Sequence, residues 1–77
     1  MEKDLLAVVI GEGTDCQYVR IKGRRTTALL KSQSIFDAFG VHELRFGDIV
    51  VVDVEHRPLG DRVVAVRAAT EEEFESR

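Results

Sequence analysis

The sequence GDIVVVDVEHRPLGDRVVAVRA, residues 47–68, predicts two β-strands joined by a tight turn. The segment Ile49–Glu55 is rich in β-branched residues, and its second half alternates valine with a carboxylate. The segment Arg57–Asp61 carries Pro and Gly at the spacing of a turn, and Arg62–Ala68 then returns as a second strand. This hairpin indicates a β-rich domain.

Three more strand and turn patterns lie toward the N-terminus. Leu5–Ile10 is a short apolar run, and the glycine-containing residues 11–15 predict a turn after it. Cys16–Lys22 alternates, which places Gln17 with two apolar residues on one face of a half-buried strand. Thr26–Lys31 follows a tight connection and predicts the hairpin partner of that strand.

A short helix is expected between the third and fourth strands, over Ser32–Gly40. Ser32 or Ser34 can cap its beginning, and Gly40 ends it. We expect the phenylalanines of this region to fill the barrel interior: Phe36, Phe39 and Phe46.

Three strands, a short helix and two strands are the element order of an all-β OB-type barrel, a closed five-stranded Greek key. An SH3-like barrel also has five short strands, but it usually has only a single helical turn before its last strand. The position and length of Ser32–Gly40 therefore favour the OB type. We expect one domain over residues 1–69.

Residues 70–77 form an acidic tail that is either a short helix or a frayed end, and Thr70 with Glu73 fits a capping box. Three of the expected strands are apolar on both faces, although a small barrel buries only its inner face: Leu5–Ile10, Ile49–Glu55 and Arg62–Ala68. The outer face is expected to be covered by the tail, through Phe74, or by a second copy of the chain in a homodimer.

Length and composition exclude several classes of protein. Seventy-seven residues leave room for one small domain, and no apolar run reaches the length of a membrane span. The single cysteine, Cys16, makes no intramolecular disulfide, and Cys16, His42 and His56 show no metal-ligand spacing. We expect a cytoplasmic protein with no signal peptide, no membrane contact, no metal and no cofactor.

No set of residues predicts catalysis. Gly11–Gly13 resembles the start of a phosphate-binding loop, but no Gly-Lys-Ser/Thr follows. His42 and His56 have no serine, cysteine or carboxylate at a telling spacing. The sequence therefore predicts that the protein is not an enzyme.

The charge distribution is more informative than the formal net charge of −3. Most of the acidity is terminal, and the stretch from Arg20 to Lys31 contains five basic residues and no acidic one. A cationic hairpin with an aromatic residue on the same strand face is typical of nucleic-acid contact.

Residues 44–67 resemble the last two strands of a bacterial cold-shock domain. The shared features are a leucine before a Gly-Asp turn, a valine-rich strand, a Pro-x-Gly turn and a final strand that ends in Val-Arg. Ribosomal S1-type OB domains, the second resemblance, also have a Gly-Asp turn before strand four. Both resemblances imply an OB fold that binds single-stranded nucleic acid without catalysis.

The cold-shock resemblance also assigns positions on strands two and three. Tyr18 matches one of the stacking aromatics of that family, whereas Arg20, Leu29 and Lys31 stand where it has two further aromatics and a histidine. We therefore expect single-stranded RNA or DNA as partner, with one base stacked on Tyr18 and phosphates held by cations. The expected nucleic-acid-binding residues are Tyr18, Arg20, Lys22, Arg24, Arg25 and Lys31.

Two alternatives remain. The basic strand can be a solvated outer face that only keeps the barrel soluble. The protein can also be a protein-protein interaction module that binds its partner through the exposed apolar strand faces or the acidic tail.

Overall fold

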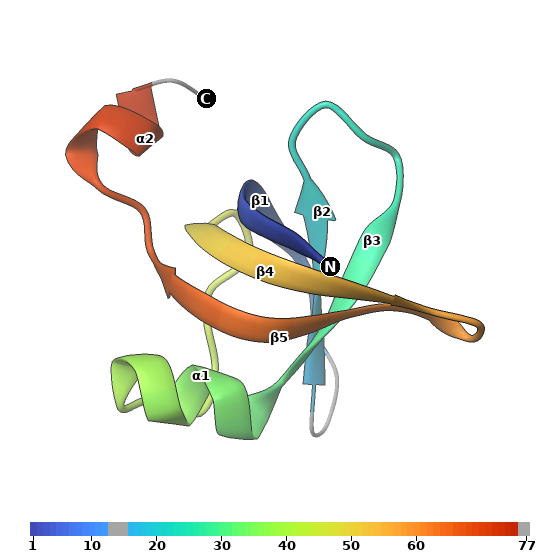
Figure 1. Cartoon of the computed structure of the whole chain (residues 1–77). Coiled ribbons are helices and arrows are strands. Elements are labelled where there is room, and N and C mark those ends of the chain that lie inside the picture. The colour runs from blue at the N-terminus through green and yellow to red at the C-terminus, as the bar shows by residue number, and fades with distance from the viewer. Residues whose placement is uncertain (13–15, 76–77) are drawn as a thin grey trace.

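A computed structural model, which describes residues 1–12 and 16–75, shows a strand-rich fold with a helix on either side of the last two strands (Figure 1). The elements are β1 (Glu2–Glu12), β2 (Cys16–Ile21), β3 (Thr27–Lys31), α1 (Ser32–Phe39), β4 (Ile49–Arg57), β5 (Gly60–Ala68) and α2 (Glu71–Glu75). The order agrees with the sequence prediction. Residues 11 and 12, expected in a turn, belong to β1, and residues 13–15 lie outside the described residues.

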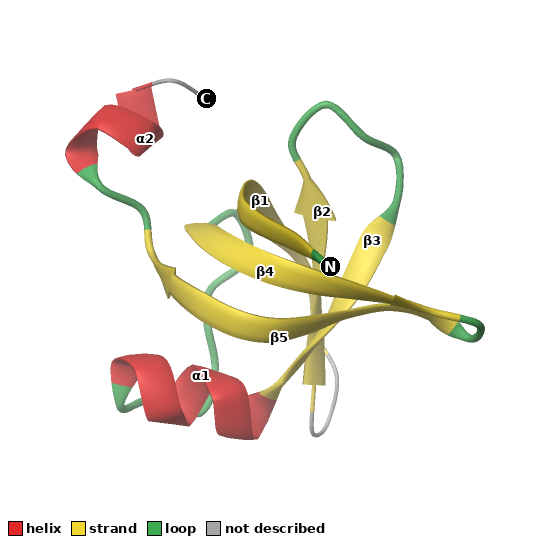
Figure 2. Cartoon of the chain, viewed as in Figure 1, coloured by secondary structure: helices red, strands yellow, loops and turns green. Residues whose placement is uncertain are grey.

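The five strands form a closed barrel in the order β1-β2-β3-β5-β4 (Figure 2). β1 pairs antiparallel with both β2 and β4, and β5 returns antiparallel to β4. The ring is closed by a parallel pairing of β3 with β5, in which Ala28 lies opposite Asp61 and Leu29 opposite Arg62. This topology, with α1 between β3 and β4, is that of an OB-type barrel and confirms the expected fold class.

The core consists of alternate strand residues that point into the barrel. Val and Ile dominate it because β-branched side chains pack well on a pleated strand. The fully or almost fully buried apolar residues of this core are Ala7, Val9, Val19, Ile21, Ala28, Leu30, Ile35, Val50, Val52, Val54 and Val63.

One end of the barrel is filled by Ile35 of α1, which is completely buried. The expectation that the phenylalanines fill the interior is wrong for Phe36 and Phe46, which are 43% and 72% exposed. Successive helical residues are about 100° apart around the axis, so when Ile35 points into the barrel, Phe36 is rotated off the buried face of the helix. Phe36 instead stacks on His42, and only Phe39 packs against the core.

The expected serine cap of α1 is also wrong. Lys31 occupies the N-cap position in an extended conformation and makes no side-chain capping hydrogen bond. The helix begins directly after β3, so Ser32 and Ser34 lie inside its first turn and cannot act as the cap. The end is as expected: Gly40 is left-handed, with φ of 75°, and its N–H donates to the Phe36 carbonyl at 2.8 Å.

Gln17 is the one polar side chain buried in the described part of the chain, and it lies on the inward face of β2, as its alternation predicts. Its Nε2 donates to the Leu44 carbonyl at 2.7 Å, and the Leu44 N–H donates to its Oε1 at 2.8 Å. Both polar ends of the amide are therefore satisfied. The side chain ties the segment between α1 and β4 to the barrel wall.

The tail forms the helix α2, and the capping box is confirmed. The Thr70 N–H donates to Glu73 Oε1 at 3.0 Å, and the Glu73 N–H donates to Thr70 Oγ1 at 3.2 Å. Arg67 of β5 holds both carboxylate oxygens of Glu73, at 2.8 and 3.0 Å, and lies 3.5 Å from Asp4. None of the helices in residues 1–12 and 16–75 is long and apolar enough to cross a membrane.

Candidate nucleic-acid interface

The outer face of β2 separates two hollows on the barrel surface. Alternation along the strand turns Val19 inward and leaves Tyr18 and Arg20 outward, both exposed. Tyr18 lines one hollow, and Arg20 lines the other. The six residues expected to bind nucleic acid are divided between these two surfaces.

The first hollow, which we call the Tyr18 groove, has a volume of about 510 Å³. It crosses from β2 over β3 to β5, because Tyr18 lies opposite Leu29 and Leu29 lies opposite Arg62. The turn between β4 and β5 forms its far wall, where Leu59 is fully exposed. The side chains that line it are those of Tyr18, Thr27, Leu29, Lys31, Arg57, Leu59, Asp61 and Arg62.

Tyr18 is well placed to stack on a planar ligand. Its side chain is 46% exposed, and it lies opposite Gly11 of β1. A Cβ atom at residue 11 would lie 3.8 Å from Cβ and Cδ2 of Tyr18, so the tyrosine occupies the space beside this glycine. A side chain at residue 11 would therefore pack against the ring of Tyr18.

The Tyr18 groove contains two arginines that the sequence analysis did not include. Arg62 is half-buried and lies across the barrel closure from Leu29. Arg57, at the end of β4, donates from its guanidinium to Glu55 at 3.0 Å. Both residues are more than 25 positions from Lys31 in sequence, so the basic cluster at residues 20–31 gave no indication of them. Arg62 could have been predicted from the expected OB topology, because that topology places β5 beside β3.

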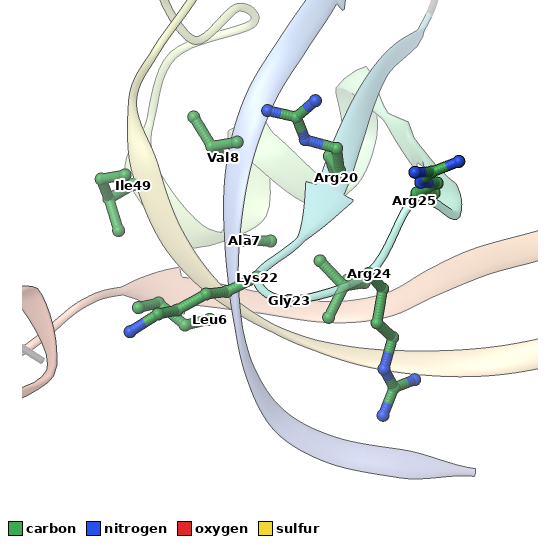
Figure 3. Close-up of a pocket in the computed structure, with 10 residues that line it drawn as sticks. Leu6, Ala7, Val8, Arg20, Lys22, Gly23, Arg24, Arg25 and Ile49 are labelled. Carbon is green, nitrogen blue, oxygen red and sulfur yellow. The ribbon is translucent and has the colours of Figure 1, made fainter. Parts of the chain in front are cut away.

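The second hollow, which we call the Leu6 groove, has a volume of about 520 Å³ and lies over β1, β2 and β4. Its partly buried apolar side chains are Leu6, Val8 and Ile49, and its basic side chains are Arg20, Lys22, Arg24 and Arg25 (Figure 3). Four of the five expected phosphate-binding cations therefore line this groove, and only Lys31 lies with Tyr18.

Arg24 is engaged within the protein. Its guanidinium makes a two-pronged ion pair with Glu2, one prong of which is 3.1 Å long. This hydrogen-bonded pair lowers the pKa of the Glu2 carboxyl and raises the pKa of Arg24. His56 lies 3.6 Å from the same carboxylate and 2.7 Å from Asp61. Arg24 thus joins the β2–β3 turn to the start of β1, and Figure 3 shows it directed away from Arg20.

No group of three or more His, Cys, Asp or Glu side chains in the described ranges could hold a metal ion. Cys16 is a free, half-buried thiol at the start of β2, and His42 stacks on Phe36 at a ring-centroid distance of 4.6 Å. Neither residue lines the Tyr18 groove or the Leu6 groove.

Comparisons with family models, with curated proteins and with solved structures each find no match to this chain. The cold-shock and S1-type resemblances of residues 44–67 therefore remain predictions. The geometry of the two grooves is the basis for a functional assignment.

Proposed function

We propose that the protein binds single-stranded RNA or DNA in the Tyr18 groove, without catalysis. The observation that carries the proposal is an exposed aromatic side chain that shares one open groove with three basic side chains: Lys31, Arg57 and Arg62. In OB-type barrels the outer face of the second and third strands, with the loops beside it, receives oligonucleotides. The Tyr18 groove occupies that same face of this barrel.

Each part of the groove has a role in such binding. A base stacks on the Tyr18 ring, which is possible for all four bases because each has a π-face. Lys31 and Arg62, on either side of Leu29, contact the phosphates that flank the stacked base. Leu29 and Leu59 provide apolar contacts for a base or a sugar, and Arg57, at the end of β4, contacts a third phosphate.

The predicted binding mode is sequence-tolerant and sensitive to salt. Stacking and phosphate contacts carry little sequence information, so pyrimidine oligomers of DNA and RNA are expected to bind with similar affinity. Each neutralised phosphate contributes about 0.7 to the slope of log K against log salt for single strands. Three phosphate contacts therefore predict a slope of about −2.

The chain contains a built-in reporter for the experiment, because Tyr18 is its one tyrosine and it has no tryptophan. Intrinsic fluorescence therefore monitors the proposed stacking residue directly. We would titrate the protein with oligo-dT and oligo-U at two salt concentrations, following tyrosine emission and the anisotropy of an end-labelled oligonucleotide. The proposal predicts quenching of Tyr18 together with salt-sensitive binding. Absence of salt-sensitive binding at low ionic strength would refute it.

A further inference from the structure

The Leu6 groove has a chemistry different from that of the Tyr18 groove. Leu6 and Val8 of β1 and Ile49 of β4 form an apolar floor on the outside of the barrel, and Val8 lies directly opposite Ile49. All three side chains are only partly buried. The inward positions of β1 and β4 are filled by core residues, and Leu6, Val8 and Ile49 occupy outward positions. These two strands are therefore apolar on both faces.

Basic side chains border this floor along one side. Arg20 and Lys22 come from the β2 side of the groove and Arg25 from the turn that follows, and Arg20 lies opposite Val8. Figure 3 shows Lys22 extended across β1 alongside Leu6. The groove therefore offers an aliphatic surface and a cationic border within one hollow of about 520 Å³.

This combination favours a protein segment over a nucleic acid. The residues that line the groove, all within the described part of the chain, include no aromatic ring on which a base could stack. A polynucleotide would use the cations and leave the aliphatic floor exposed to water. A peptide with an apolar side chain between carboxylates would use both surfaces. Its apolar side chain would bury the aliphatic floor, and its carboxylates would pair with the cations.

The chain's own acidic helix gives a second indication. Glu72 and Glu73 of α2 line an adjoining hollow together with Asp4, Leu6 and Lys22. Leu6 and Lys22 also line the Leu6 groove, so the two hollows meet at these two residues. An acidic segment therefore already lies against one end of the groove, while Val8 and Ile49 line only the part beyond it.

We propose that the Leu6 groove is a docking site for an acidic segment of another protein, which inserts one aliphatic or aromatic side chain over Leu6, Val8 and Ile49. Its flanking carboxylates pair with Arg20, Lys22 and Arg25. The site is separate from the Tyr18 groove, so a protein partner and an oligonucleotide can bind the same barrel together.

The probe is a labelled peptide with one leucine flanked on both sides by glutamates. The control peptide has serine in place of the leucine. Fluorescence anisotropy measures the affinity of each peptide for the full chain. Burial of the leucine predicts that the first peptide binds about tenfold more tightly. Equal affinities would overturn the proposal, because attraction between charges alone would then account for the binding.

Three variants locate the bound peptide. The double variant Lys22→Gln/Arg25→Gln removes two positive charges and is expected to weaken the binding of both peptides. Val8→Thr keeps a β-branched side chain in the strand and is expected to reduce the advantage of the leucine peptide. The double variant Arg57→Gln/Arg62→Gln, in the Tyr18 groove, removes the same number of charges and is the matched control; it is expected to leave both peptide affinities unchanged. Circular dichroism melts check that each variant folds. Peptide affinities unaffected by the Val8 and Lys22/Arg25 changes would overturn the assignment.

Two further measurements separate the other possible occupants. Oligo-dT is expected not to displace the leucine peptide, and displacement would show that nucleic acid occupies this groove instead. A concentration-dependent dimer in light scattering that the Val8→Thr change abolishes would show that the groove receives a second copy of the chain. Failure of oligonucleotide binding to the Tyr18 groove would leave the peptide result unchanged, so the two proposals fail independently.

Discussion

The Gln17 side chain and the backbone of Leu44 exchange two hydrogen bonds, at 2.7 and 2.8 Å, across 27 positions of sequence. The pairing resembles one step of a β-ladder in which a side-chain amide replaces the second strand. It joins the barrel wall to the segment that connects α1 with β4, and it leaves no buried polar atom of Gln17 without a partner.

We predict that Gln17→Leu destabilises the fold. The change keeps a side chain of similar size but leaves the N–H and the carbonyl of Leu44 without their partner, at a cost of about 1–3 kcal/mol. The midpoint of thermal unfolding is then expected to fall by several degrees. Gln33→Leu is the matched control, because Gln33 is exposed and bonds only to Asp37 among the contacts that the structure shows. Equal melting temperatures for the two variants would contradict the role of the Leu44 pairing.

Gln17→Glu is expected to make stability depend on pH in a defined direction. A carboxylate at this position cannot donate to the Leu44 carbonyl, whereas the protonated acid can. Burial raises the pKa of the introduced carboxyl in the folded state, so the variant is closest to wild type below about pH 4 and loses stability as the pH rises. Urea unfolding across the pH range, each point referenced to the wild type, measures this difference. A difference that does not vary with pH would contradict it.

Tyr18→Ala is expected to weaken single-strand binding by about 1–3 kcal/mol, which is roughly 5- to 150-fold. The salt slope should stay nearly constant, since no phosphate contact is lost. Tyr18→Phe keeps the stacking ring and should bind almost as tightly as the wild type. Anisotropy with end-labelled oligo-dT measures all three proteins, and the stacking role fails if the Ala and Phe variants bind alike.

The two arginines Arg62 and Arg24 should respond differently to neutralisation. Arg62 lines the Tyr18 groove, so Arg62→Gln is expected to reduce the magnitude of the salt slope by about 0.7. Arg24 is paired with Glu2 outside that groove, and Arg24→Gln is expected to leave the slope unchanged. Each variant removes one positive charge, which makes them matched controls for net charge. The same slope change in both would show that binding follows overall charge and not the groove.

Attachment of α2 is expected to weaken at low pH. The paired hydrogen bonds from Arg67, together with the Thr70 backbone, lower the pKa of Glu73 from 4.5 to about 2. A lowered pKa in the folded state means that the stabilisation is complete above pH 4.5 and is lost as the pH falls toward 2. Side-chain NMR titration of Glu73 measures this, and Arg67→Gln should return the midpoint toward the ordinary value. A midpoint near 4.5 in the wild type would contradict the pairing.

The element order could be predicted from the sequence because the relevant information is local. Alternation along Cys16–Ile21 distinguishes the inward from the outward face, and Gly40 can end a helix with no reference to the rest of the chain. The choice of Ile35 over Phe36 as the buried residue was not predictable in this way. It depends on the rotation of α1 against the barrel, which is a property of tertiary packing.

In the candidate site, too, residues that are close in sequence could be predicted, whereas those that meet only in the folded barrel could not. Tyr18 and Lys31 were found because the β2–β3 hairpin is formed by residues close in sequence. Arg62 was missed because it reaches Tyr18 only through the pairing of β3 with β5. The ion pair of Arg24 was missed because its partner, Glu2, lies 22 positions away, at the start of β1.

The parallel pairing of β3 with β5 has a consequence for how the protein folds. Ala28 and Asp61 must find each other across a long stretch of chain before the ring closes, so closure is a high-contact-order event that we expect late on the folding pathway. The Tyr18 groove spans this junction, with Tyr18 and Lys31 on one side and Arg62 on the other. An oligonucleotide bound there would bridge the last-formed junction, so binding should slow local opening and increase hydrogen-exchange protection of the β3 and β5 amides.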